Sequence, residues 1–296
     1  MSYAAVIGTF DGLHRGHMAL LQRLRHEALR TNEKTMVVTF SHHPLALLRP
    51  DAMPKLLDDN TNRLKRLEKE VDKVLVLSFN PELQQKTASE FIAMLAREGV
   101  STLLMGYDTR FGSDMPRDIE SYRKAGAEVG VRIIILDSAV RDAETVIASS
   151  AIREAIGQGD ISTANKLMGR PYQLSGTVVS GRHQGRTIGF PTANIEVPAE
   201  RMIPASGVYG ATAILADGSQ HPAMVNIGNC PTFTDGTKQT IEAHLTDFSG
   251  DIYGQSITLL FVARIRSEKR FGSANELVAQ LKCDREAILH ALATQQ

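Results

Sequence analysis

The chain has 296 residues, and its 33 Lys and Arg residues balance its 33 Asp and Glu residues, so its formal net charge is zero. This balance excludes the basic surface of a nucleic-acid-binding protein and the polybasic patch of a membrane-bound one, so we expect neither nucleic acid nor membrane as a partner. No apolar segment approaches the ~20 residues that cross a bilayer, and the N-terminus has no secretory pattern, so the expected location is cytoplasmic.

The length indicates about two domains, since a domain has roughly 100–200 residues. The two cysteines, Cys230 and Cys283, form neither a CxxC nor a Cys/His metal pattern. They are most simply buried small residues of a protein that is kept in a reducing compartment.

Strands and helices are predicted to alternate through the first half of the chain. Short apolar runs rich in β-branched residues predict strands at 4–7, 35–40, 73–77, 101–105 and 132–136. Apolar residues at helical spacing, as at 18–24 and 91–95, lie between them. This order predicts a Rossmann-like α/β domain with a parallel sheet covered on both faces, in which ligands bind beyond the C-terminal strand ends.

A glycine-rich turn, GTFDGLHRGH at 8–17, joins the first strand to the first helix. Its glycines let backbone N–H groups approach a phosphate, and the helix N-terminus adds unpaired donors. His14 and His17 are three residues apart and can face one anion. The pattern resembles the HxGH nucleotidyltransferases, which implies His14 and His17 as catalytic groups and ATP contacts at Gly8, Thr9, Phe10, Gly12 and Gly16. A polar surface pair at an ordinary turn is the other interpretation.

The pattern changes near Gly159. Asp160 is expected to cap a helix that ends before Gly169, and Pro171 forbids its continuation, so we predict domains at 1–169 and 170–296. Short alternating segments at 173–180, 208–215, 223–227, 240–245 and 256–265 then predict an antiparallel Greek-key-type β-barrel. Ser273 and Glu276 predict a capping box at the start of a C-terminal helix.

The second domain contains GRTIGFPTAN at 185–194, followed by GVY, NIG, PTF, IEAHL and YG segments between 207 and 254. These segments, in this order, resemble a riboflavin kinase module. The whole chain resembles the family of prokaryotic bifunctional riboflavin kinase/FAD synthetases. The resemblance implies phosphorylation of riboflavin to FMN in the C-terminal domain and adenylylation of FMN to FAD, with release of pyrophosphate, in the N-terminal domain. Riboflavin, FMN and ATP are the implied small-molecule partners, and Mg²⁺ is the implied cofactor.

The resemblance also assigns roles in the kinase module. It implies Mg-ATP at Thr192 and Asn194, whose side-chain oxygens suit Mg²⁺. The glycine-rich stretch 181–189, which includes Gly185 and Gly189, is itself predicted to be a mobile flap that covers the phosphates. It implies a general base at Glu242, on the polar face of an alternating strand. Alternation alone favours a solvated face for Glu242, and a turn after Pro191 would explain Thr192 and Asn194 equally well. Arg266 is a further ligand candidate, for which a surface ion pair is the simpler interpretation.

Other family segments are altered in the first domain. The family's Ser-Ser-Thr-x-Ile-Arg segment reads ASSAIR at 148–153, which implies ATP contacts at Ser149 and Ser150 and a catalytic Arg153, within a segment that is also a helix start. The flavin-side segment Gly-x-Asp-Phe-x-Phe-Gly reads GYDTRFG at 106–112. Asp108 and Phe111 are therefore implied flavin contacts, although Phe111 is as well explained by the core.

The departures lie on the flavin side. Thr109 replaces an aromatic residue, and Phe-x-Pro-His-Pro reads FSHHP at 40–44, with Ser41, His42 and His43 and one proline fewer. We expect nucleotide binding to be intact, whereas the binding of FMN by the first domain is left open. The leading hypothesis is the bifunctional enzyme. Its alternatives are a riboflavin kinase whose first domain is a nucleotide- or flavin-sensing module, or one whose first domain adenylylates a different acceptor.

Overall fold

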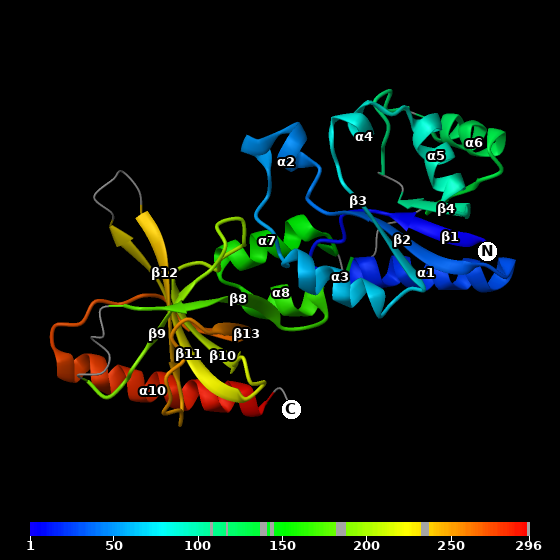
Figure 1. Ribbon diagram of the computed structural model, residues 1–296. Coiled ribbons are helices and arrows are strands. Elements are labelled where there is room, and N and C mark those ends of the chain that lie inside the picture. Colours follow the sequence, from blue (N-terminus) through cyan, green and yellow to red (C-terminus); the bar gives the residue numbers. More distant parts are fainter. Residues whose placement is uncertain are drawn as a thin grey trace. The chain divides into compact units, whose positions relative to one another are not determined.

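The computed structural model describes residues 1–106, 109–116, 118–136, 141–142, 145–181, 188–231 and 237–294. The chain divides into two compact units (Figure 1). Unit 1 comprises Met1–Pro54 and Asp59–Ala148, and unit 2 comprises Lys55–Asp58 and Ser149–Gln296. The functional division at residues 169 and 170 stays a prediction.

Unit 1 is built on a parallel sheet of five strands in the order β3-β2-β1-β4-β5. The strands are β1 (Tyr3–Ile7), β2 (Lys34–Phe40), β3 (Lys73–Leu77), β4 (Val100–Gly106) and β5 (Arg132–Leu136). The expected parallel sheet is confirmed, with strand bounds that differ by at most one residue at each end. The chain order reverses at β1, whose neighbours are β2 and β4, and the C-terminal end of β1 leads directly into Gly8. The glycine-rich turn therefore lies at the point of an open α/β sheet where ligands bind.

Helices cover both faces of this sheet, as Figure 1 shows. On one face, Leu21 and Leu24 of α1 (Arg15–Thr31) and Leu67 of α3 (Asn60–Glu68) pack with residues of β1 such as Val6. On the other face, α5 (Ala88–Arg97) and α6 (Ile119–Glu128) form a second core around Phe91, Ile92 and Tyr122. The remaining elements of unit 1 are α2 (Leu45–Leu48), η1 (Pro50–Ala52), α4 (Pro81–Gln85), β6 (Arg141–Asp142) and β7 (Thr145–Val146).

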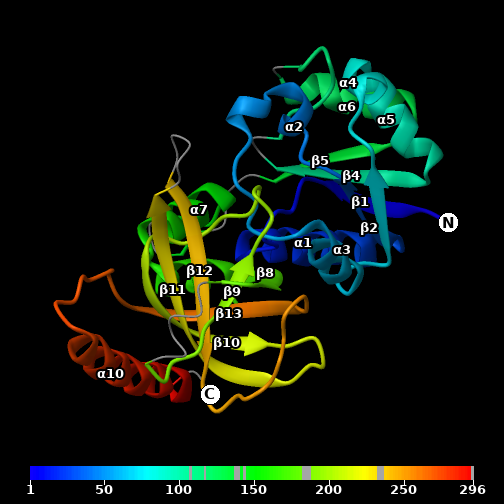
Figure 2. The same cartoon turned by 60° about the vertical axis from the view of Figure 1, so that its left-hand side comes forward.

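Unit 2 contains a closed antiparallel barrel with the strand order β10-β11-β12-β9-β8-β13. Its strands are β8 (Tyr172–Val179), β9 (Ala193–Glu196), β10 (Gly207–Ile214), β11 (Gln220–Pro231), β12 (Thr237–Leu245) and β13 (Ser256–Arg266). The predicted barrel is confirmed, and β9 is an additional strand that the sequence pattern did not indicate. The other elements are α7 (Ser149–Gln158), α8 (Ile161–Met168) and α10 (Ala274–Ala293). Helix α10 packs against β10, β11 and β13 (Figure 2).

The predicted helix ends are largely confirmed. Asp160 accepts a hydrogen bond from the Thr163 amide at the start of α8, and Gly169 ends that helix at φ +75°. Ser273 caps α10 by accepting from the Glu276 amide, but the Glu276 carboxylate accepts from the amide of Gly272 rather than closing the box on Ser273. The capping box is therefore present only in a shifted form.

Four residues, Lys55–Asp58, leave unit 1 and pack within unit 2. Leu57 is fully buried there, and the Asp58 carboxylate forms an ion pair of 3.1 Å with Arg170. The buried Arg201 donates to the carbonyl of Leu57 at 3.1 Å and to that of Gln173 on β8 at 2.8 Å. We call Lys55–Asp58 the strap.

Among the helices of the described residues, none is long and apolar enough to span a bilayer. Cys283, which was expected to be buried, is exposed on α10 because it lies outside the face of the helix that packs on the barrel.

Candidate active sites

The first candidate site is the turn of residues 8–17 at the end of β1. Its backbone bends sharply: Phe10, Gly12 and Leu13 have φ values of +52°, +80° and +37°. Such angles are strained for Phe and Leu and persist only where the surrounding structure enforces them. Strain of this kind concentrates at functional sites, so the backbone supports the prediction that this turn has a binding role.

Gly16 is required by close packing in the same turn. A Cβ atom at this position would lie 2.6 Å from the backbone oxygen of Ile147 and 3.0 Å from Nδ1 of His14. A Cβ at Gly8 would lie 3.2 Å from the Phe10 ring, which is a tighter contact than usual. The glycines thus let the turn fold against itself and against the segment that precedes α7.

His14 and His17 lie together, as their spacing predicts. His14 is buried and caps α1, because its Nδ1 accepts from the His17 amide at 3.4 Å. The two imidazole rings stack with centroids 3.7 Å apart, and Phe10 lies 5.1 Å from His17 on another side. Burial, and secondarily the charge of His14, hold the pKa of His17 well below its ordinary value. His17 is therefore neutral at neutral pH.

The segment Ser149–Arg153 forms the first turn of α7 in unit 2, which agrees with the interpretation as a helix start. Arg153 donates from Nε to the carbonyl oxygen of Lys55 in the strap, at 2.6 Å. The strap thereby fixes the plane of a guanidinium group that was predicted to contact ATP. The predicted ATP contacts of Ser149, Ser150 and Arg153 themselves stay predictions.

The flavin-side segment is described only in part. Asp108 lies outside the described residues. Phe111 is half-buried and packs on the core of unit 1, with its ring centroid 5.0 Å from Phe91 and 4.9 Å from Tyr122. The Tyr122 hydroxyl also accepts from the Phe111 amide and donates to its carbonyl. Phe111 therefore has a structural role, and a flavin contact for it stays a prediction.

The second candidate site lies on β9 and β12 of the barrel. Ile241, Ala243 and Leu245 are buried, whereas Glu242 and His244 are half-exposed, so the expected alternation is confirmed. Glu242 stands opposite Asn194 of β9 and opposite Asn226 of β11. Directly opposite residues on antiparallel strands have Cβ atoms ~4.5–5.5 Å apart, so these three polar side chains form one row across the sheet.

The chain around Thr192 and Asn194 is held firmly. His244 Nδ1 lies 2.8 Å from the carbonyl oxygen of Pro191, and the His244 and Phe190 rings are 5.1 Å apart. A Cβ at Gly181 would lie 1.9 Å from Nδ2 of Asn194, so the absence of a side chain there lets Asn194 occupy its position. Gly189 has φ +80° and lies in a turn, whereas Gly185 lies outside the described residues.

A mostly apolar cavity of about 220 Å³ adjoins Thr192. Val178, Leu245, Phe248 and Tyr253 contribute apolar and aromatic surface to it. Cavities of this kind, with a few polar groups at one end, suit small-molecule ligands. Phe248 and Tyr253 come from the irregular segment between β12 and β13, where spacing carries no information about side-chain direction. Tyr253 belongs to the YG segment of the resemblance, but nothing in the sequence indicates that the two rings line one cavity.

Thr192 and Asn194 offer a hydroxyl and an amide oxygen, which are hard donors that fit Mg²⁺ together with substrate phosphates and water. Within the described residues there is no cluster of three or more His, Cys, Asp or Glu side chains that could hold a metal ion alone. Two such oxygens fill only part of a Mg²⁺ coordination shell and leave its other positions to phosphates and water.

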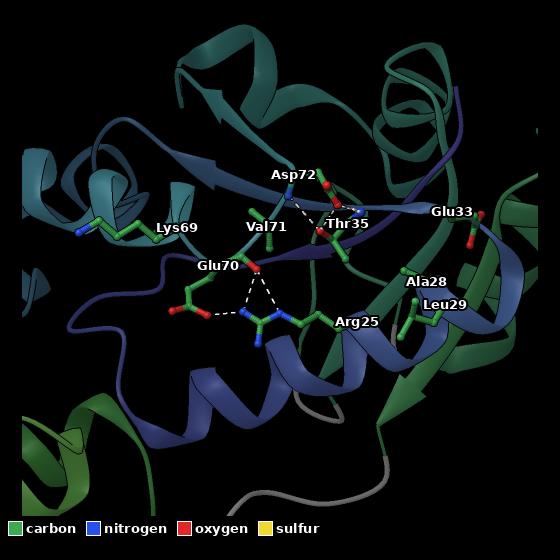
Figure 3. A pocket seen from close by; sticks show the side chains of 9 residues that line it. All are labelled: Arg25, Ala28, Leu29, Glu33, Thr35, Lys69, Glu70, Val71 and Asp72. Carbon is green, nitrogen blue, oxygen red and sulfur yellow. Dashed lines mark hydrogen bonds and ion pairs between the residues drawn. The ribbon is translucent and has the colours of Figure 1, made fainter.

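A larger hollow of about 460 Å³ lies in unit 1 near the start of β2 and is drawn in Figure 3. Three of its charged groups bind neighbours: Arg25 pairs with Glu70, and the Asp72 carboxylate accepts from the Thr35 amide and hydroxyl at 2.8 and 2.6 Å. These bonds hold the pKa of Asp72 below its ordinary value. The hollow lies at the N-terminal ends of the strands, away from the turn of residues 8–17, and we place no substrate there.

Arg266 was expected, on the simpler interpretation, to form an ion pair at the surface, but its partner is buried. It forms a two-pronged ion pair with Asp284 of α10, with bonds of 3.0 Å from Nε and 2.8 Å from Nη2 to the same carboxylate oxygen, Oδ2, and a third of 3.1 Å from Nε to Oδ1. Asp284 is almost fully buried, because α10 packs on the barrel at this point. The pair joins α10 to β13 rather than lying on the surface.

Comparison with known proteins identifies two family models along the chain. The model described as FAD synthetase matches residues 2–151, and the model described as riboflavin kinase matches residues 168–292. The chain is 39% identical over 286 residues to the bifunctional riboflavin kinase/FMN adenylyltransferase of Escherichia coli K12, covering 94% of this chain and 89% of that protein. The protein of the same name from Pseudomonas fluorescens is 34% identical over 282 residues, covering 95% of this chain and 90% of that protein.

Among solved structures, the chain is similar to one described as a macrolide-efflux protein from Streptococcus pneumoniae. The TM-score is 0.86 at 33% identity, with coverage of 97% of this chain and 94% of that one. The similarity therefore extends over both units of the fold.

Proposed function

Since the chain belongs to the family of bifunctional riboflavin kinase/FMN adenylyltransferases, we propose specific residues for its two reactions. The enzyme phosphorylates riboflavin to FMN with its C-terminal domain and adenylylates FMN to FAD with its N-terminal domain, using ATP in both. The observation that carries the residue assignments is the row of Asn194, Glu242 and Asn226 in the barrel together with the stacked histidines at the end of β1.

In FAD formation, an FMN phosphate oxygen attacks the α-phosphorus of ATP, and the bond from that phosphorus to pyrophosphate breaks. An ionised phosphate is its own nucleophile, so the protein must align two anions and stabilise the charge on the leaving group. The turn at Gly8, Thr9, Phe10, Gly12 and Gly16 presents its backbone to the phosphates. His14 and His17 supply side-chain donors.

One atom of His17 supports this role. Its Nδ1 is buried and, within the described part of the chain, has no hydrogen-bond partner. Buried polar atoms are normally paired, and a phosphate oxygen of bound ATP would supply the missing acceptor. A neutral imidazole carries one N–H, and with that hydrogen on Nδ1 His17 would donate to the phosphate oxygen.

In FMN formation, the ribityl hydroxyl attacks the γ-phosphorus of ATP, the bond from that phosphorus to the bridging oxygen breaks, and ADP leaves. The proton of the hydroxyl passes to Glu242 as general base. Both families are expected to require a divalent metal ion, and we propose that this ion is Mg²⁺. Thr192 and Asn194 would hold it together with the ATP phosphates. When bound, the ion neutralises charge on the transferred phosphoryl group. The cavity lined by Phe248 and Tyr253 has the size and apolar walls to take the adenine of that ATP.

These assignments are tested by following flavins chromatographically. Purified protein with Mg-ATP should convert riboflavin to FMN, and FMN to FAD, in separate incubations. The His17→Ala variant should lose FAD formation and retain FMN formation. Equal loss of both activities in that variant would refute the assignment of His17.

FMN formation without FAD formation by the unmodified enzyme would favour the sensing module, and a product from another phosphate acceptor would favour a different adenylylation. A cytoplasmic location, where ATP is made available to both reactions, stays part of the proposal.

A further inference from the structure

Arg63 is a buried cation directly behind the nucleotide-binding turn. It lies in the first half of α3, and only 7% of it is exposed. Arginine is almost never this buried unless it is bound to partners on several sides. One turn later, Leu67 of the same helix is fully buried in the core under β1, so the position of α3 is fixed by packing.

The guanidinium group of Arg63 joins three parts of unit 1. Nη1 donates to the carbonyl oxygen of Thr9 at 2.7 Å and to Oγ1 of Thr39 at 2.6 Å. Nη2 donates to the carbonyl oxygen of Phe40 at 2.6 Å and to Oδ1 of Asn60 at 2.5 Å. One side chain thus ties the turn after β1 to the C-terminal end of β2 and to the start of α3.

The bond from Arg63 to Thr9 is made at the residue that precedes the positive φ angles of the turn. The next residue, Phe10, has φ +52°, and Gly12 and Leu13 also have positive φ values. A conformation of this kind needs external support, and a charge-assisted hydrogen bond to the preceding carbonyl provides it. Within the turn itself, the Leu13 amide donates to the Phe10 carbonyl at 3.1 Å. The peptide group that Arg63 holds through Thr9 is therefore followed directly by a residue whose own carbonyl closes the turn.

Arg63 also contributes charge. Its guanidinium is always protonated, so each of the four hydrogen bonds above is charge-assisted.

We propose that Arg63 is a positioning residue for FAD formation. It acts through Thr9 and holds the turn in the shape that receives the ATP phosphates. The inference rests on the proposed function of this turn, and it adds a residue that neither the turn motif nor its spacing indicates.

The test compares three variants of the full-length enzyme. Arg63→Met removes the charge and all four bonds, Arg63→Lys keeps the charge but loses the planar fork, and Lys65→Met is the matched control. Lys65 is exposed on the same helix, so its substitution removes one positive charge without touching the turn. For each variant, kcat and the KM values for ATP and FMN are measured for FAD formation, and FMN formation from riboflavin is measured in parallel.

We expect kcat/KM for ATP in FAD formation to fall by about 100-fold in Arg63→Met, since small misplacement of binding groups has effects of this order. Arg63→Lys should show an intermediate loss, and Lys65→Met should match the unmodified enzyme. The KM for ATP should rise while the KM for FMN stays within about twofold, and FMN formation should be unchanged. A merely structural role would lower kcat through the fraction of folded enzyme and leave both KM values unchanged, which would overturn the proposal.

If Arg63→Met does not fold, Thr39→Val decides the question. Thr39 is fully buried, and valine has nearly the same shape but can neither accept the bond from Nη1 nor make the weak 3.5 Å bond from Oγ1 to the Thr9 carbonyl. A raised KM for ATP in this variant, with an unchanged thermal midpoint, supports the proposal. Unchanged FAD kinetics in both Thr39→Val and Arg63→Lys overturn it. If the proposed function of unit 1 were wrong, the unmodified enzyme would form no FAD from FMN. That outcome is distinct from a failure of the Arg63 proposal, in which the unmodified enzyme forms FAD and the variants form it equally well.

Discussion

Replacing Glu242 with glutamine should remove the base of the kinase reaction while preserving its surroundings. Glutamine has the same length and shape, and position 242 keeps its backbone pairing with Asn194 and Asn226 on the two neighbouring strands. The side chain is half-exposed, so water can solvate the amide that replaces its carboxylate. The variant should therefore fold and bind riboflavin as before.

A positioned general base contributes roughly 10²- to 10⁴-fold, which corresponds to about 2.7–5.4 kcal/mol of activation free energy. We expect kcat for FMN formation in Glu242→Gln to fall by at least ~100-fold. The KM for riboflavin should stay within about threefold, because the lost interaction matters chiefly in the transition state.

The assay is single-turnover conversion of riboflavin to FMN in rapid-quench samples, so that product release cannot mask the chemical step. Glu196→Gln is the matched control, since Glu196 is an exposed carboxylate at the end of β9. FAD formation from FMN in the same preparation reports the amount of folded enzyme. A single-turnover rate within about threefold of the unmodified enzyme would refute Glu242 as the base.

Three further predictions concern other contacts. Gly16→Ala should abolish FAD formation but not FMN formation, because the new Cβ would meet the Ile147 backbone oxygen at 2.6 Å. Asp284→Asn should destabilise unit 2 by about 3 kcal/mol in urea unfolding, since it breaks a buried ion pair with Arg266. Thermal stability of unit 1 should fall as the pH drops below 6.5, because the pKa of His17 lies well below that value in the folded state. The unfolded chain then binds more protons than the native one, and His17→Gln should remove this pH dependence.

Each of these predictions has an outcome that contradicts it. FAD formation at the normal rate by Gly16→Ala would show that the turn relaxes around the extra carbon. An unchanged urea midpoint for Asp284→Asn would mean that α10 does not depend on its ion pair. Equal slopes of stability against pH with and without His17 would place the titrating group elsewhere.

The sequence predicted the features that depend on local pattern. Apolar runs located all five strands of the parallel sheet, and alternation along 240–245 placed Glu242 on the polar face of its strand. Spacing placed His14 and His17 on one side of α1. These features could be predicted because a period of two or of 3.6 residues is set by the backbone itself.

The features that were missed depend on contacts between distant parts of the chain. Strand β9 has only four residues, and it is a strand because β8 and β12 pair with it. Arg63 lies in a polar helix, where an arginine normally faces solvent, and only the folded structure brings it to Thr9 and Phe40. Asp284 likewise resembles a surface charge until α10 packs on the barrel.

The strap has a practical consequence for dissecting this enzyme. A single break in the chain cannot separate the two compact units, because Leu57 and Asp58 precede most of unit 1 in sequence yet fold with the second unit. A fragment that stops before α7 would carry an uncovered leucine and a carboxylate deprived of Arg170, which invites aggregation. Chimaeras built from related enzymes should therefore exchange residues 55–58 along with the barrel, so that donor and acceptor side chains come from the same parent.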